Sequence, residues 1–434
     1  MEACYTKPLE LSILMRVLAL ARHNNDIDFM TPVLDQLTCQ EGIEIYYLLT
    51  SFELSVENDW RLRHLQSYPS VQVVSVWDIL PKRFLDNLFK WLSSLPHSLG
   101  GVGWGKRKIY KIVSIYLRGR PWAERVQLFM ESLSPSMVLC DWMNPLHNRA
   151  QKYPPYTYAD IYQWSISHKV PCFSLPHGLM LFDLPRNNDF LFSDFFSITF
   201  VESEQRKKVL VGNGENPQKI IVSGAPRYDE KWISFTQSMA HRMPSFLKKD
   251  HFVIVFFATK LVYNYDFEKL LEWLLELGGS ENVQLIVQPH PRGQKKSAFS
   301  PLFSHPSIIV DDQTPAMELI HHAQAVSTLV SSVVVDAIVQ DKPVLYPKFL
   351  HDKVTRFEEA GACYQLNDMT ETRAAVKQLQ SGWKPLSTNR ANFLRDTVFG
   401  AGRQQVVELI LKELFQFCSK QQASPVHCDH SPDP

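Results

Sequence analysis

Two histidines stand in short proline-containing segments that follow apolar runs. His177 lies in PHG, directly before Gly178, and His290 lies in QPHPR, close to Arg292. Imidazole titrates near neutral pH, so a histidine that projects into a cleft can exchange a proton with a substrate. An imidazole and a guanidinium on one rigid loop are suited to a phosphate. Each histidine could equally be an ordinary structural or surface residue in a stiff turn.

A third candidate is the serine pair Ser331-Ser332 in the stretch Ala325–Tyr346. The pair separates an apolar run from a helix-like segment, and a second apolar run follows, so the stretch predicts strand, helix and strand. Serines at the start of a helix can cap it and leave backbone N–H groups directed into a cleft. Such a helix start at the carboxyl edge of a parallel sheet binds anions. An ordinary cap in a crossover unit is the alternative.

Alternating apolar and amphipathic segments must position these candidates, and their order favours parallel α/β sheets. Leu11–Arg22 fits a strand or a helix, and the polar, proline-containing segment Trp232–Lys249 predicts a connector. Further strands are expected at 43–49, 71–76, 136–140, 170–174, 197–201, 219–222, 252–258, 283–287 and 307–310, and helices at 30–37, 158–167, 266–277, 315–322, 370–379 and 404–417.

A chain of 434 residues predicts two domains. We expect a first domain at 1–235, a second at 250–400, a closing helix at 401–419 and a disordered tail at 420–434. The candidate segments, with SGAPRYD at 223–229 added, follow predicted parallel strands, two segments in each half. Ligands bind at the carboxyl ends of such strands, so the cleft between the domains is the expected site.

The composition excludes several classes of protein. Forty-five basic residues balance 45 acidic ones, which argues against a nucleic-acid binder. The seven cysteines form no CxxC pair or zinc-like spacing, so we expect reduced thiols in a cytosolic protein. We expect neither secretion nor a membrane span, because the sequence shows no signal-peptide pattern and no run of about eighteen uncharged apolar residues. The basic amphipathic segment Lys106–Arg120 is typical of a solvated helix face that packs on its own domain, and the alternative is peripheral contact with an anionic membrane surface.

Absent motifs narrow the chemistry. The sequence has no Walker A loop, no GxGxxG loop and no paired-aspartate strand motif of the DxD kind. We therefore expect neither a metal nor a bound cofactor.

Four segments resemble the motif series of the CDP-glycerol glycerophosphotransferase and capsule polysaccharide biosynthesis group. They are PHG at 176–178, SGAPRYD at 223–229, QPHPR at 288–292 and TLVSSVVVDAIVQDKPVLY at 328–346. The resemblance covers roughly residues 135–366. It implies the GT-B fold, in which two Rossmann-like domains with parallel sheets face each other across a cleft, with the acceptor on the first and the nucleotide donor on the second.

The resemblance also implies a function. It is the metal-independent transfer of a sugar or polyol phosphate from a CMP- or CDP-linked donor to a glycan or lipid-linked acceptor, in surface or capsular polysaccharide synthesis. His177 would be the general base. Asp336 would stabilise the helix that follows Ser331-Ser332, to which it belongs. The implied donor-phosphate ligands are His290, Arg292, Ser331 and Ser332, and the implied cleft residues are Gly178, Arg227, Asp229 and, toward the ribose, Glu358 or Glu359.

Two departures from the group and two alternatives accompany this interpretation. The chain reads ATKLVYN where an APTWR-like sequence is expected, and its first domain is long. One alternative is an enzyme similar to UDP-N-acetylglucosamine 2-epimerases, which would bind a UDP-sugar without an acceptor. It would need several carboxylates around the sugar, and the sequence alone does not place them. The other alternative is an inactive GT-B module that serves as a scaffold in polysaccharide assembly.

Overall fold

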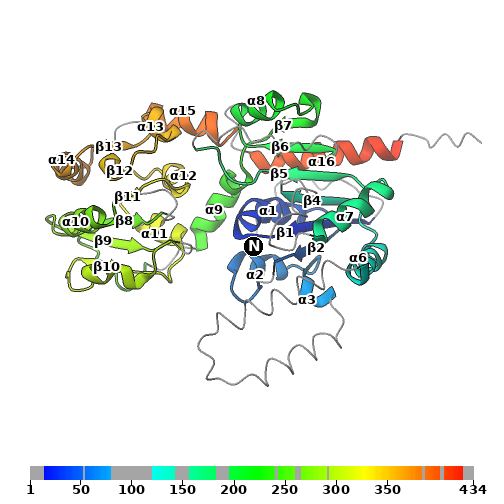
Figure 1. Cartoon of the computed structure of the whole chain (residues 1–434), viewed down its shortest axis with the longest axis horizontal. Coiled ribbons are helices and arrows are strands. Elements are labelled where there is room, and N and C mark those ends of the chain that lie inside the picture. Colours follow the sequence, from blue (N-terminus) through cyan, green and yellow to red (C-terminus); the bar gives the residue numbers. More distant parts are fainter. Residues whose placement is uncertain are drawn as a thin grey trace, which may run out of the picture.

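The computed structural model describes residues 14–51, 54–79, 120–141, 156–181, 195–239, 243–259, 265–290, 293–383, 387–400 and 405–423. Two parallel sheets, each flanked by helices, form two Rossmann-like domains (Figure 1). This confirms the predicted α/β fold class of the GT-B type.

The first sheet has seven strands in the order β3-β2-β1-β4-β5-β6-β7, all paired in parallel. Parallel strands are covered by helices on both faces, so they form nearly continuous apolar runs. The strands are β1 (Met15–Ala21), β2 (Ile43–Leu49), β3 (Val71–Ser75), β4 (Met137–Asp141), β5 (Cys172–Leu175), β6 (Ile198–Val201) and β7 (Ile220–Val222).

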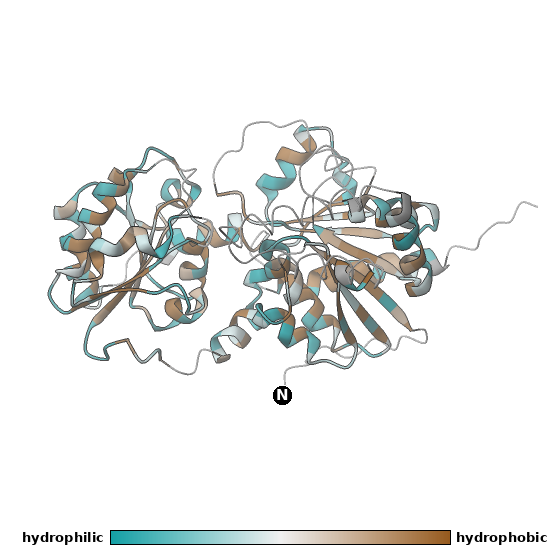
Figure 2. Ribbon diagram, turned by 60° about the horizontal axis from the view of Figure 1, so that its bottom comes forward, coloured by the Kyte–Doolittle hydropathy of each residue, from teal (hydrophilic) through white to brown (hydrophobic). Residues whose placement is uncertain are grey.

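The second sheet has six parallel strands in the order β10-β9-β8-β11-β12-β13. Figure 2 shows the strands of both sheets as predominantly hydrophobic segments. The strands are β8 (Phe252–Phe257), β9 (Val283–Gln288), β10 (Ile308–Val310), β11 (Ala325–Thr328), β12 (Val344–Pro347) and β13 (Tyr364–Leu366).

The helices follow from capping and one-sided apolar patterns. In α10 (Phe267–Gly278), the Asp266 side chain accepts the Lys269 amide at 3.1 Å, and Trp273 and every leucine except Leu275 are buried. The other helices are α1 (Asn24–Leu37), α2 (Trp60–Gln66), α3 (Val76–Ile79), α6 (Arg120–Leu133), α7 (Tyr156–Ser167), α8 (Glu204–Gly212), α9 (Glu230–Met239), α11 (Ala316–His322), α12 (Val333–Val339), α13 (Arg356–Glu359), α14 (Met369–Gln380), α15 (Ser387–Thr397) and α16 (Val406–Ala423), with 3-10 turns η2 (Pro217–Lys219), η3 (Pro226–Tyr228), η5 (Lys296–Leu302) and η6 (Lys348–Leu350).

The chain crosses between the domains twice. The turn η3 and helix α9 lead from the first domain to the second, and α15 and α16 lead back (Figure 1). The last helix packs on the first domain, where the Phe417 ring lies 5.4 Å from the Phe173 ring. Asp229 fixes this return, because its carboxylate accepts the Val407 amide at 3.0 Å. The C-terminal helix is therefore a structural part of the first domain.

Several expectations differ from the structure. Trp232–Lys249 is not simply a connector, because α9 extends to Met239 and buries Trp232 and Ile233 on one face. Helix α1 already begins at Asn24, before the predicted start at residue 30, because Asp26 anchors its first turn. Helix α16 continues to Ala423 rather than ending at 419.

Of the remaining predictions, some are confirmed, one is wrong, and one concerns residues that the structure does not describe. Leu11–Arg22 contains a strand rather than a helix. The buried Cys140, Cys172, Cys363 and Cys418 are free thiols, but Cys39 is disulfide-bonded, so the prediction of reduced cysteines is wrong there. Of the basic segment Lys106–Arg120, all but Arg120 lies outside the described residues. Within the part of the chain that the structure describes, no helix is both long and apolar enough to cross a bilayer.

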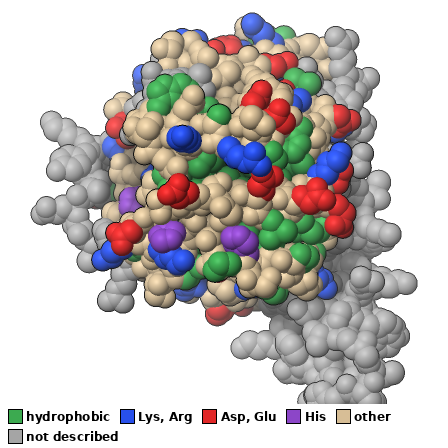
Figure 3. Space-filling model, turned by 90° about the vertical axis from the view of Figure 1, so that its left-hand side faces the viewer, with side chains coloured by type: hydrophobic (Ala, Val, Ile, Leu, Met, Phe, Trp, Pro, Cys, Tyr) green, Lys and Arg blue, Asp and Glu red, His purple; other side chains and the backbone are tan. Residues whose placement is uncertain are grey.

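The outer end of the second domain carries charges of both signs. Figure 3 shows Lys and Arg side chains interspersed with Asp and Glu side chains on this face. Opposite charges that lie close together partly cancel each other's field at a distance.

Candidate functional site

His177 lies directly after β5, at the carboxyl edge of the first sheet. Its Nδ1 is 2.7 Å from Asp26 Oδ1 and 3.1 Å from Asp141 Oδ2. Gly178 follows with φ +85°, a conformation that favours glycine, and a Cβ there would meet nothing within 4 Å. The histidine side chain is 17% exposed, whereas the two carboxylates are 0% and 2% exposed. Of these three side chains, the imidazole is therefore the one that solvent or a ligand can reach.

Three neighbouring strands of the first sheet bring this acid–base cluster together. The strand order places β1 beside β4 and β4 beside β5. The residues of the cluster lie at or shortly after the carboxyl ends of these three strands. After β1, the Arg22 and His23 amides donate to Asp26 Oδ2 at 2.7 and 3.0 Å. Asp141 is the last residue of β4. We define the acid–base cluster as Arg22, Asp26, Asp141 and His177.

The two aspartates change the charge state of His177. Burial alone would lower the histidine pKa, but hydrogen bonds to Asp141 and Asp26 outweigh it and raise the pKa from 6.5 to about 9. At neutral pH His177 is therefore an imidazolium. The general-base role that the resemblance implies would require this proton to leave first, and that role stays a prediction.

Arg22 completes the cluster. Its guanidinium pairs with Asp141 and lies 4.9 Å above the Tyr158 ring. Burial opposes the charge on Arg22, but the nearby Asp141 carboxylate more than offsets this, so the pKa of Arg22 is raised. Two cations thus balance two carboxylates, which is how a buried charge cluster remains tolerable.

The same cluster contains a potential metal-binding set. Ligand atoms of Asp26, Asp141 and His177 all lie within 4.8 Å of one another. A divalent ion would have to displace the His177 proton and compete with Arg22, because metal ligands must be deprotonated. The residues therefore fit an ion pair better than a metal, and the absence of a metal requirement stays a prediction.

The donor side of the predicted site lies at the carboxyl edge of the second sheet. The Thr259 hydroxyl, just beyond β8, donates to the Val330 carbonyl at 2.7 Å and so joins the ends of β8 and β11. Gly293 lies so close that a Cβ would be 2.8 Å from the Thr259 carbonyl and 3.0 Å from the His290 Cβ. His290 is partly buried in this loop. Arg292 lies outside the described residues.

The serine pair begins α12 differently from the prediction. Ser332 has helical φ and ψ and makes no side-chain cap, so its predicted capping role is wrong. The Ser331 hydroxyl accepts the Val333 amide in a long contact of 3.4 Å. Ser331 is partly buried and Ser332 is exposed. Because the backbone is already helical at Ser332, its hydroxyl makes no capping hydrogen bond and the residue is exposed.

The other predicted residues are found in several places. Asp229 is buried and accepts the Lys231 and Val407 amides at 3.0 Å each, so both of its carboxylate oxygens make hydrogen bonds within the fold. Glu358 pairs with Lys348 at 2.9 Å and closes a capping box with Thr355. Glu359 is exposed. Their predicted substrate contacts stay predictions.

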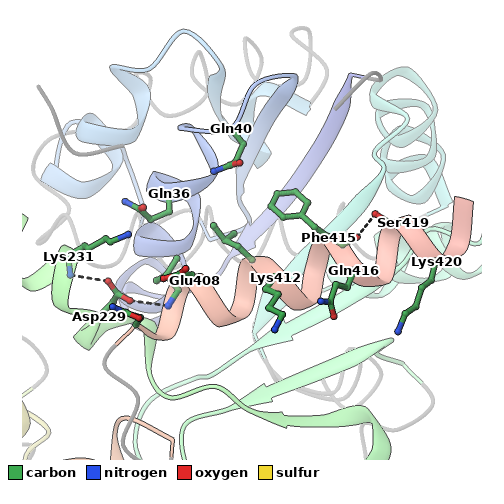
Figure 4. Close-up of a pocket in the computed structure, with 13 residues that line it drawn as sticks. Gln36, Gln40, Asp229, Lys231, Glu408, Lys412, Phe415, Gln416, Ser419 and Lys420 are labelled. Atoms are coloured by element: carbon green, nitrogen blue, oxygen red, sulfur yellow. Dashed lines mark hydrogen bonds between the residues drawn. The ribbon is translucent and has the colours of Figure 1, made fainter. Parts of the chain in front are cut away.

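A pocket of about 500 Å³ lies away from the cluster, along α16. Figure 4 shows Gln36 and Gln40, in and after α1, opposite this helix. Asp229 and Lys231 also line the pocket, but no residue of the acid–base cluster does. The pocket therefore does not coincide with the candidate site.

The structure resembles solved sugar-nucleotide enzymes at low sequence identity. A UDP-GlcNAc 2-epimerase from Methanocaldococcus jannaschii is 16% identical with a TM-score of 0.58, and the match covers 93% of this chain and 100% of that one. A putative UDP-N-acetylglucosamine 2-epimerase from Listeria monocytogenes is 13% identical with a TM-score of 0.60, covering 94% and 97%. The Neisseria meningitidis enzyme bound to UDP-GlcNAc is 14% identical with a TM-score of 0.58, covering 93% and 100%.

Comparisons of the sequence with protein-family models and with curated proteins give no match. At such low identity, the structural likeness establishes the fold and leaves the activity open. It supports the GT-B architecture but gives no support to the CDP-glycerol glycerophosphotransferase group in particular.

The sequence did not single out Arg22, Asp26 or Asp141 as site residues. A signal was available, because Asp141 ends an apolar strand and Asp26 follows another. The strand order, which alone makes them neighbours of His177, could not be read from the chain.

Proposed function

We propose that this protein is an enzyme that acts on a nucleotide-activated sugar, with the nucleotide on the second domain and proton transfer at His177. The observation that carries the proposal is the acid–base cluster at the carboxyl edge of the first sheet, because ligands of parallel α/β sheets bind at this edge. Asp26 and Asp141 are too deeply buried to reach a substrate directly. They act instead as positioning residues that orient the imidazole and set its charge.

The fold likeness favours a UDP-sugar 2-epimerase activity. Inverting C2 requires the C2–H bond to break, with its proton passing to a base. The C1–O bond to UDP breaks in the same elimination, and its electron pair leaves with UDP. The reverse addition restores the C1–O bond and returns a proton to the opposite face of C2. We assign the return of this proton to the His177 imidazolium, since its raised pKa makes it a donor at neutral pH.

The second domain would hold the nucleotide. His290, Arg292, Ser331 and Ser332 remain the proposed ligands of the phosphates, and Glu358 or Glu359 the proposed partner of a ribose hydroxyl. Backbone amides near the exposed Ser332 would offer uncharged donors to an anion. No metal or cofactor is required in this scheme.

Deuterium exchange tests the proposal directly. UDP-GlcNAc is incubated with the protein in D₂O, and the sugar is analysed by mass spectrometry and NMR. We expect one deuterium at C2 together with the C2 epimer. Absence of exchange, with nucleotide release only when a glycan acceptor is added, would contradict the epimerase assignment.

Nucleotide release that occurs only when a glycan acceptor is added would support a transferase activity. The observation in its favour is that PHG and the serine pair follow β5 and β11, where the resembling motif series requires them. The proposal then includes a CMP- or CDP-linked donor, a glycan or lipid-linked acceptor, capsular polysaccharide synthesis and a cytoplasmic site with peripheral membrane contact through Lys106–Arg120.

A thermal-shift panel of UDP, CDP, CMP and GDP separates the donors, because a ligand stabilises the state that binds it. Stabilisation by UDP alone supports the epimerase, and stabilisation by CMP or CDP supports the transferase. No response to any nucleotide would overturn both enzyme proposals and favour the scaffold.

A further inference from the structure

One arginine joins the two domains through a pair of carboxylates. Arg227, in η3, donates from Nη1 to Asp28 Oδ2 at 2.8 Å. Its Nη2 donates to both oxygens of Asp336 at 2.9 Å, and its Nε reaches Asp336 Oδ1 at 3.2 Å. Asp28 belongs to α1 in the first domain and Asp336 to α12 in the second. The guanidinium fork is thus shared between both halves of the molecule.

The first-domain end of this bridge is held rigidly. Arg61 also pairs with Asp28 and makes a second ion pair with Asp59. Asp59 caps α2 by accepting the Arg61 amide at 2.9 Å. Asp28 is therefore fixed between two arginines, so its position does not depend on Arg227 alone.

Both ends of the bridge belong to elements of the candidate site. Asp28 lies two residues after Asp26, the buried partner of His177, near the start of the same helix. Asp336 lies in the first turn of α12, and this helix begins directly after the serine pair. A shift of α12 relative to α1 would therefore move the donor loop relative to the acid–base cluster.

We propose that Arg227 is a positioning residue that sets the distance between the donor loop at Ser331-Ser332 and the imidazole of His177. This inference rests on the proposed function. Arginine suits the task because its planar fork can satisfy two carboxylates at fixed angles, which a lysine cannot do.

The electrostatics favour a positioning role over a purely stabilising one. Asp336 is buried, and burial raises its pKa to about 6 despite the opposing effect of Arg227. A buried ion pair contributes little net stability, because desolvation offsets the attraction, although it can specify geometry. The groups that face Asp336 include Arg227 from η3 and the like-charged Asp28 from α1. The bridge therefore fixes one arrangement of the domains at a small gain in stability.

The test compares Arg227→Lys with Arg16→Lys. Lysine retains the positive charge at position 227, so the buried carboxylates stay compensated and the protein should still fold. It lacks the planar fork that binds both carboxylates. Arg16 pairs with Glu44 at 3.1 Å within the first domain and serves as the matched control. Circular dichroism verifies folding, and Asp336→Asn provides a second variant from the other side of the bridge.

We expect Arg227→Lys to lower kcat for C2 deuterium exchange about a hundredfold, since small misplacements of reacting groups cost this much. Calorimetry should show a UDP dissociation constant within about twofold of wild type, because the binding loops are intact. Asp336→Asn should change the same quantities in the same direction, and Arg16→Lys should leave them unchanged. Wild-type kcat in Arg227→Lys, or a loss of UDP affinity with kcat retained, would overturn the proposal.

Small-angle X-ray scattering separates this inference from the proposed function. If the wild type turns over no nucleotide sugar, the proposed function fails, but the bridge can still be measured. A larger radius of gyration in both Arg227→Lys and Asp336→Asn than in wild type and Arg16→Lys supports the bridge. Equal radii in all four proteins would overturn it.

Discussion

The two sheet edges that face the proposed substrate are built differently. The edge of the first sheet carries paired charges that are almost fully buried, and His177 is the most exposed of them. The edge of the second sheet carries the partly buried His290 together with uncharged groups, namely the buried Thr259, Gly293 and the exposed Ser332. Buried pairs shift pKa values, whereas exposed hydroxyls and amides can bind an anion without changing their charge. This difference is the basis on which we propose proton transfer in the first domain and nucleotide binding in the second.

The largest effect should follow from removing the imidazole. His177→Gln should lower turnover by about two to four orders of magnitude, since proton transfer contributes this much in general acid–base catalysis. His168→Gln is the matched control, because His168 is exposed in the same domain and stacks on Trp164. Steady-state kinetics on the substrate found by the nucleotide panel provides the measurement. Equal rates for the two variants would refute the role of the cluster.

The pH dependence of stability tests the raised pKa of His177 in the first domain. The folded pKa of His177, about 9, exceeds its ordinary value of 6.5. The ion pairs of His177 therefore stabilise the fold fully below pH 6.5 and lose this contribution as the pH rises through 9. Urea unfolding of wild type and His177→Gln should show a stability difference that shrinks between these pH values. A difference that stays constant would mean that His177 has an ordinary pKa.

Substitution of the serine pair probes the opposite edge. The Ser331→Ala/Ser332→Ala variant should weaken nucleotide binding about tenfold, because a hydrogen bond to a charged phosphate contributes about 1.5 kcal/mol. Turnover at saturating substrate should change little. Ser381→Ala, at an exposed position of the same domain, is the control. Calorimetric affinities equal to wild type would remove the serines from the donor site.

The smallest effect concerns the backbone beside His177. Gly178 and Gly212 both have open space where a Cβ would be, but only Gly178 has a positive φ. Gly178→Ala should therefore cost about 1 kcal/mol of unfolding free energy, whereas Gly212→Ala, at the end of α8, should be neutral or slightly stabilising. Chemical denaturation measures both. Equal effects would show that the φ of Gly178 imposes no constraint.

The sequence predicted the architecture well for a physical reason. Parallel strands buried on both faces are continuous apolar runs, so 43–49 and 252–258 were identified almost to the residue. Helix α9 was missed because its segment is mixed in polarity and ends near a proline, although one face of it is buried.

The site was harder to predict because its contacts are not local. His177 could be chosen from its own proline and glycine neighbours. Its partners Asp26 and Asp141 meet it only through the strand order, and Arg227 reaches both Asp28 and Asp336 only when the two domains lie together. The capping prediction for Ser332 was wrong because residue preference does not determine where the helical backbone begins.

The most direct test of this division of labour is the UDP affinity of His177→Gln. If the first domain supplies only proton transfer, calorimetry should give a dissociation constant within about twofold of wild type while turnover is lost. A dissociation constant about tenfold or more above wild type would show that the acid–base cluster itself holds the nucleotide. That result would contradict the assignment of chemistry to the first domain and binding to the second.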